Sequence, residues 1–366
     1  MGKRLYDRLI DALILRGGAI YPRKVRATYE LLQELFASEE AELACSMPLE
    51  LSTAKKIADH AGKEIDESVA ILENMANKGL VFTYEKGGIR YYRLMALAPG
   101  IYEYQFMSGE VSERTRKLAR LFDECTPVSG KESGAFNAPT FPFSRVLPVE
   151  KEIERGVDVQ PYEKVSEYIT NSKHITVSTC YCRHHAELVG NACEKPKEVC
   201  MSLGPGAKFV AERGFGRLVS KEEALHILQL SEAAGLVHCS SNTTKNIDFI
   251  CNCCICHCAI LQHHKDLTKI NLAAPSNFIV EVDQVSCQAC EICVDRCPMD
   301  AFSMENSQIV RDPQLCIGCG LCVSTCPSGS LRMVPREGHQ TPPRDQQQLL
   351  TLMAASVPEK KSRLHQ

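Results

Sequence analysis

Eight cysteines in the last quarter of the chain have the spacing of ligands for two metal clusters. Cys287-x2-Cys290-x2-Cys293-x3-Cys297 precedes a proline, and the same pattern recurs 29 residues later with Cys316, Cys319, Cys322 and Cys326. Three thiolates separated by two residues can bind three corners of one cubane, while the fourth, set by the following proline, reaches the other cluster. The repeat therefore predicts two 4Fe-4S clusters that exchange one ligand each.

The interleaved pattern gives two ligand sets. Set I contains Cys287, Cys290, Cys293 and Cys326, and set II contains Cys316, Cys319, Cys322 and Cys297. Zinc sites with four cysteines also use two-residue spacings, but two runs that both end in Cys-Pro fit iron-sulfur clusters better. Gly318 and Gly320, beside the second run, are expected to let the backbone approach the sulfides closely.

This part of the sequence resembles the bacterial two-cluster ferredoxins over residues 277–335. Both cysteine runs match the ferredoxin pattern without a substitution. The resemblance implies a ferredoxin-like domain that carries two 4Fe-4S clusters and transfers electrons.

A second group of ten cysteines lies between residues 180 and 258 and matches no ferredoxin loop. The stretches HITVSTCYC and IDFICNCC alternate apolar and polar residues, which is typical of strands. We expect the first strand end to present Cys180 and Cys182 on one face. The second would present Cys251 and Cys253 on one face, with Cys254 and Cys256 on the other. The helical sequence between them would bring these ends side by side, which predicts one additional 4Fe-4S cluster, or two.

The ligands of this second region remain open to more than one assignment. We expect Cys180, Cys182, Cys193 and Cys200 to form one centre, with Cys251, Cys253, Cys254 and Cys256 joining the same centre or a second one. The competing hypothesis is zinc, or mixed ligation that uses His184, His185, His257, His263 or His264. Cys45, Cys125 and Cys239 are expected to be ordinary buried cysteines.

The length, charge and cysteine content of the chain exclude several classes of protein. The chain has 366 residues, 20 cysteines and a formal net charge of −3, so no global basic field favours nucleic acid or an anionic membrane surface. Short-spaced cysteines are typical of metal ligation, not of a secreted disulfide scaffold. The N-terminal sequence MGKRLYDRLIDALILRGG has charges that interrupt any signal-peptide core, and no transmembrane segment is visible. We therefore expect a cytoplasmic protein.

The N-terminal third predicts a helical unit with a winged-helix order. Two helices are expected over 4–46, and a helix, a turn, a second helix and a hairpin follow. The second helix carries Asp66, Glu67 and Glu73 against only Lys78, so it would repel phosphates. This favours a structural or partner-docking role over DNA binding.

Together these patterns predict a multidomain α+β fold. The expected parts are a helical, winged-helix-like unit (1–95), an extended arm (96–171), a central α/β cysteine-rich module (172–276), a two-cluster ferredoxin-like domain (277–335) and a mostly disordered tail (336–366). The tail is expected to hold at most one short helix, at QLLTLMAA.

The whole chain also resembles a group of iron-sulfur proteins of anaerobic bacteria and archaea, through the segments MANKGL, APGIYEYQF and the CYCR module beside the ferredoxin domain. The resemblance implies an anaerobic cytoplasm and a redox partner or an oxidoreductase complex. The leading hypothesis is an electron-transfer subunit or partner of a larger oxidoreductase. A redox-sensing winged-helix regulator and an oxidoreductase with its own open-site cluster are the alternatives.

Overall fold

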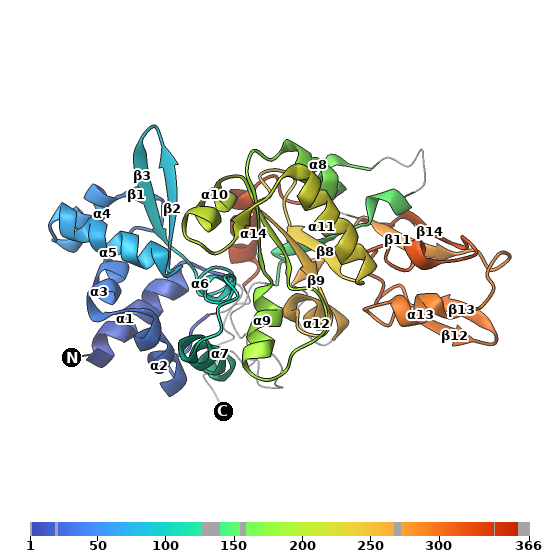
Figure 1. Cartoon of the computed structure of the whole chain (residues 1–366), viewed down its shortest axis with the longest axis horizontal. Helices are drawn as coiled ribbons and strands as arrows, with labels where there is room; N and C mark the ends of the chain where they lie inside the picture. Colours follow the sequence, from blue (N-terminus) through green and yellow to red (C-terminus); the bar gives the residue numbers. More distant parts are fainter. Residues whose placement is uncertain are drawn as a thin grey trace, which may run out of the picture.

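The computed structural model describes residues 2–18, 21–125, 140–153, 159–266, 272–339 and 341–357. A helical unit forms one end of the molecule, a mixed sheet covered by helices forms the middle, and a small domain of two hairpin-like sheets forms the other end (Figure 1). The fold thus mixes helices and sheets, as the sequence predicts.

The N-terminal unit is a helical core with a small sheet at one side. Amphipathic helices build its core, because their apolar residues recur every three or four positions. In the first helix these residues include Leu9, Ile10 and Leu13, which are all fully buried. Its elements are α1 (Gly2–Leu15), α2 (Arg26–Leu35), α3 (Ser38–Ser46), β1 (Ser52–Thr53), α4 (Ala54–Ala61), α5 (Ile65–Asn77), β2 (Val81–Lys86) and β3 (Ile89–Leu94).

Helices α4 and α5 and the hairpin β2–β3 follow one another in the order that the sequence predicts. Thr53 caps α4 by accepting a hydrogen bond from the Lys56 amide, and Gly62 ends this helix in the left-handed conformation. The hairpin turns at Gly87 and Gly88, which both have positive φ. Strand β1 adds to the hairpin, giving the order β1-β3-β2.

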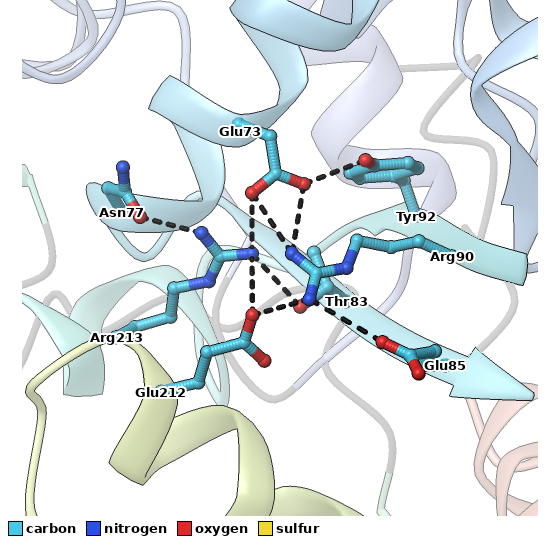
Figure 2. Close-up of polar contacts among 8 residues, drawn as sticks. All are labelled: Glu73, Asn77, Thr83, Glu85, Arg90, Tyr92, Glu212 and Arg213. Atoms are coloured by element: carbon cyan, nitrogen blue, oxygen red, sulfur yellow. Dashed lines mark hydrogen bonds and ion pairs between the residues drawn. The ribbon is translucent and has the colours of Figure 1, made fainter. Parts of the chain in front are cut away.

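A network of charged side chains joins this unit to the central module (Figure 2). Glu73 of α5 accepts hydrogen bonds from Tyr92 and Arg90, and an ion pair of 2.8 Å joins it to Arg213. Arg90 of β3 also reaches Glu212 at 2.5 Å. Glu212 ends α10 (Gly204–Glu212), and Arg213 follows it. Charged residues of α5 and of the hairpin β2–β3 therefore form ion pairs with Glu212 and Arg213 of the central module.

Aromatic side chains reinforce the same contact. Phe209 of α10 lies 5.1 Å, ring to ring, from Phe82 of β2 and 5.3 Å from Tyr104. Tyr104 closes the short helix α6 (Ile101–Tyr104) and also meets Phe215 at 5.0 Å. Such tilted and edge-to-face pairs stabilise a packed interface beyond the apolar area that they bury.

The central module is a seven-stranded sheet in the order β10-β4-β8-β9-β6-β5-β7, with only the β10–β4 pair parallel. Its strands are β4 (Ser144–Leu147), β5 (Ile175–Thr179), β6 (Glu198–Leu203), β7 (Arg217–Leu218), β8 (Val237–Ser241), β9 (Phe249–Cys253) and β10 (Ala273–Ala274). Its helices, besides α10, are α8 (Val165–Asn171), α9 (Tyr181–Leu188), α11 (Lys221–Ala233) and α12 (Ala259–Lys265). Helix α7 (Glu113–Cys125) packs between α2 and α9.

The C-terminal domain contains two antiparallel strand pairs, one short α-helix and one 3-10 helix, η3 (Val323–Thr325). Its elements are β11 (Phe278–Val282), α13 (Ile292–Arg296), β12 (Phe302–Glu305), β13 (Gln308–Arg311) and β14 (Leu331–Pro335). The Val149 amide donates to the Cys319 carbonyl at 3.0 Å, and Arg296 donates to backbone carbonyls at the end of α11. The domain is thereby attached to the central module.

The tail contains the short helix that the sequence predicts at QLLTLMAA. Residues Gln346–Ala355 form α14, whose N-cap residue, Asp345, accepts a hydrogen bond from the Gln348 amide through its side chain. Leu349 and Met353, four residues apart on one face, are buried. The expected arm over 96–171 falls partly outside the described residues, at 126–139 and 154–158.

The network of Figure 2 gives a first prediction. Arg213→Ala should lower the unfolding free energy of the N-terminal unit by about 2 kcal/mol, because the side chain is only 5% exposed and serves charged partners. Arg217→Ala is the matched control, because that side chain is 53% exposed and its ion pairs are screened by water. Urea unfolding followed by tyrosine fluorescence measures both variants, and equal losses would contradict the assigned role.

Candidate metal centres

The two cysteine runs of the C-terminal domain have matching backbones. Ala289 and Glu291 in the first run have φ of 51° and 60°, and Gly318 and Gly320, at the same positions of the second, have 67° and 80°. The repeat therefore forces non-glycine residues into the left-handed region in its first copy. A Cβ at Gly318 would clash with the Phe278 carbonyl oxygen, so this glycine is required by the strand packed beneath it.

The structure brings the four cysteines of set I together. They line one small cavity with Ile292, Ile309 and Leu331. Burial, and then the negative charges of the other three thiolates, raise the pKa of Cys293 to about 11, despite a backbone hydrogen bond that lowers it. Cys290 is exposed at the domain surface.

Cys326 closes set I from the far end of the sequence repeat. Its Sγ lies 3.3 Å from the Ser330 hydroxyl and 3.5 Å from that of Ser328. Burial raises the pKa of this thiol, but hydrogen bonds from Ser330, Ser328 and nearby backbone amides outweigh it and lower the pKa to about 7. These hydrogen bonds thus favour the thiolate form of Cys326, the form that binds metal.

The structure also brings the four cysteines of set II together, in a more buried position. Cys316, Cys319 and Cys322 are buried, and Cys297 is partly buried. Burial and then the charges of Cys319 and Cys297 raise the pKa of Cys322 well above its usual value. The Ala301 amide donates to Cys297 Sγ at 3.3 Å. Two sets of four thiols with hydrogen-bond donors to sulfur fit 4Fe-4S clusters.

In the central module, three neighbouring strands place cysteines in a row across the sheet. Cys239 of β8 is paired directly with Cys251 of β9. The β6–β9 register, in which Met201 faces Ile250, places Cys200 beside Cys251 on its other side. Paired residues on adjacent strands project to the same face. Cys253, two residues after Cys251, lies on that face as well.

Two helix starts bring three more thiols to this face. Cys180 is the N-cap residue of α9, Cys182 lies in its first turn, and Cys258 is the N-cap residue of α12. The strand predicted to carry Cys180 and Cys182 ends earlier, at Thr179. We call the resulting set the central thiol group: Cys180, Cys182, Cys200, Cys251, Cys253 and Cys258.

The sulfur atoms of the central thiol group lie within hydrogen-bond reach of one another around a closed ring, in the order Cys180, Cys182, Cys258, Cys253, Cys251 and Cys200. Each thiol has one proton and donates one hydrogen bond at a time. Hydrogen bonding with its two ring neighbours lowers the pKa of Cys180 well below its usual value, and it lowers the pKa of Cys251 to about 6. The pKa of Cys258 is lowered in the same way.

The remaining cysteines are grouped differently from the expectation. Cys193, expected with Cys180, Cys182 and Cys200, lies instead with Cys254 and Cys256, and these three Sγ atoms are all within 4.8 Å of one another. We call them the thiol triad. Sequence reasoning did not select Cys258, and it treated Cys239 as isolated although it hydrogen-bonds to Cys253. The period-two pairing across β6, β9 and β8 is the signal that places Cys239 here.

Two of the candidate histidines are used by the protein core. His184 Nε2 lies 2.9 Å from the Glu110 carbonyl, and His185 is held between the Tyr102 hydroxyl at 2.5 Å and the Ala119 carbonyl at 3.0 Å. Within the described residues, no group of three or more possible metal ligands whose atoms lie within 4.8 Å of one another includes a histidine. His257 lies in the turn before α12, and His263 and His264 lie on α12, so mixed Cys/His ligation stays an untested alternative.

A buried arginine supplies positive charge between the two thiol sets. Arg183 is 1% exposed, and its Nη1 donates to the Asn252 carbonyl at 3.2 Å. Burial opposes the charge of the guanidinium, but Cys180 and Cys254 outweigh this effect and raise the pKa of Arg183. The central module therefore balances part of its thiolate charge with its own cation.

Comparison with known families agrees with the C-terminal geometry. Residues 279–327 match the family of 4Fe-4S dicluster domains, a stretch that includes both cysteine sets. No curated protein and no solved structure matches the chain. The C-terminal part is thus an iron-sulfur, ferredoxin-like domain. None of the helices in the described ranges has the length and apolar character needed to cross a membrane.

The hydroxyl of Ser330 gives a second prediction. Ser330→Ala removes a hydrogen bond to a set I sulfur, so the midpoint potential of that centre should become more negative by tens of millivolts. One net hydrogen bond contributes about 1 kcal/mol, which is roughly 40 mV for one electron. Redox titration followed by electron paramagnetic resonance measures the shift.

Ser324→Ala is the control for this experiment. Its hydroxyl donates to the Leu321 carbonyl at 3.1 Å and to no sulfur. The control should leave both potentials unchanged, and an equal shift in the two variants would argue against the sulfur contact.

Proposed function

We propose that the chain is an iron-sulfur electron-transfer protein, a subunit or redox partner of a larger anaerobic oxidoreductase. In this proposal the C-terminal domain exchanges electrons between a protein partner and a further cysteine-ligated centre in the central module. Bound clusters would supply one-electron chemistry in the three places. Sets I and II would hold one 4Fe-4S cluster each, and the central thiol group would hold the third centre.

One observation carries this proposal: the thiol-bearing face of the central sheet and the C-terminal domain share one hydrophobic core. Cys253 and Cys258 of the central thiol group belong to the same buried apolar cluster as Cys293, Cys316 and Cys319. A dry, continuous packing of this kind excludes water between centres. It also holds their separation constant, which electron transfer requires.

Set I and set II lie in different surroundings, which supports set I as the centre that meets a protein partner and set II as the centre that faces the central module. Set II lies toward the central module, where the Val149 amide donates to the Cys319 carbonyl. Set I lies toward solvent, with Cys290 exposed. Val285, 96% exposed, and Ile292, 41% exposed, flank this outer set. An apolar rim beside an exposed redox site suits a transient protein partner.

The engaged α5 helix argues against the alternative of a DNA-reading regulator. The Glu73 carboxylate forms ion pairs with Arg90 and Arg213 of the same chain. Asp66 and Glu67 leave the start of that helix acidic. Neither feature favours contact with a phosphate backbone.

Iron analysis of cysteine variants tests the proposal. Protein purified without oxygen should contain about twelve iron ions per chain, four for each of three clusters. Cys290→Ala, Cys319→Ala and Cys253→Ala should each remove about four and leave the signals of the other two centres. Cys45→Ala, in the N-terminal unit, is the control that should lose none.

The outcomes are distinct. Loss of all iron in each variant would contradict separable centres. Eight iron ions per chain, unchanged by Cys253→Ala, would remove the third centre from the proposal and leave a two-cluster carrier.

A further inference from the structure

The thiol triad has the geometry of a single-ion site. Its three Sγ atoms lie within 4.8 Å of one another. Thiolates that share one tetrahedral zinc ion at about 2.3 Å must lie roughly 3.8 Å apart. The spacing of the triad is therefore close to what one ion needs.

We propose that Cys193, Cys254 and Cys256 bind one thiophilic divalent ion of the zinc class, at a site separate from the iron-sulfur centres. Cys193 comes from the loop between α9 and β6, and the other two come from the turn after β9. The ion would join these two loops, which are far apart in the sequence. The inference uses none of the cysteines assigned to the relay and does not depend on it.

The charge around the triad points to a bound cation with an anionic ligand shell. Three thiolates around a divalent ion carry one net negative charge. Arg183, fully buried beside Cys254, can offset that charge. Its Nε and Nη2 atoms are buried without a hydrogen-bond partner among the described residues, so the guanidinium still has donors to offer to sulfur.

The exposure of the three cysteines suits an accessible ion. Cys254 is buried, Cys193 is partly buried and Cys256 is exposed. Among the residues that the structure describes, no fourth cysteine, histidine or carboxylate joins the group. A solvent molecule or an external ligand would complete the tetrahedron, as in zinc sites that keep one open position.

Metal analysis of the full chain tests the proposal. Protein purified without oxygen should carry about one zinc ion per chain in addition to its iron. Cys256→Ser should reduce the zinc content to near zero and leave the iron content unchanged. Cys45→Ser is the matched control and should retain both metals.

Cobalt gives an independent readout. Protein produced in zinc-depleted medium should take up one Co²⁺ ion and show thiolate-to-cobalt charge-transfer bands with the visible bands of tetrahedral cobalt. Both should be absent from Cys256→Ser. A loss of about four iron ions in this variant would overturn the proposal, since it would place Cys256 on a cluster.

A disulfide within the triad in the purified protein, or three thiols that react freely with no zinc present, would overturn it as well. Failure of the relay proposal would look different, because the chain would then hold about eight iron ions that Cys253→Ala leaves unchanged, while the zinc of the triad stays intact.

Discussion

The central module is governed by the repulsion between thiolates held within contact of one another. Six thiols form a closed ring in which each sulfur atom lies within hydrogen-bond reach of two others. Ionising all six would crowd six negative charges into a buried space, at a free-energy cost that the protein's own contacts do not offset. Full ligation is possible only with metal charge in place, so the fold and the metal content of this region depend on each other.

The sequence predicts an iron-sulfur, ferredoxin-like domain at the C-terminal end, because the cysteine pattern of that domain lies within one short repeat. It also predicts helices α4 and α5 and the hairpin β2–β3, whose apolar periodicity and turn glycines are local signals. Two helices were expected over residues 4–46, but the second is divided into α2 and α3 because Phe36 and Ala37 adopt extended backbone between them. The reason for Gly318 could not be read this way. It arises from the Phe278 carbonyl, forty residues away in the chain.

The central cysteines were predicted as ligands but not in their groups, because grouping depends on strand register. Adjacent cysteines such as Cys253 and Cys254 belong to different sets, since the strand ends between them. Cys239 lies beside the central thiol group, outside it, because β8 pairs it with Cys251 across the sheet. Sequence spacing carries no information on which strands become neighbours, and the order β8-β9-β6-β5 was not predictable from it.

The origin of the ligands also sets an order for folding. The C-terminal domain draws both of its sets from residues 287–326, so these eight thiols can come together within one short stretch of chain. The central thiol group draws on α9, β6, β9 and the start of α12, and these meet only when the sheet is assembled. The thiols of the central module therefore come together late in folding, after strands and helices distant in the sequence have packed.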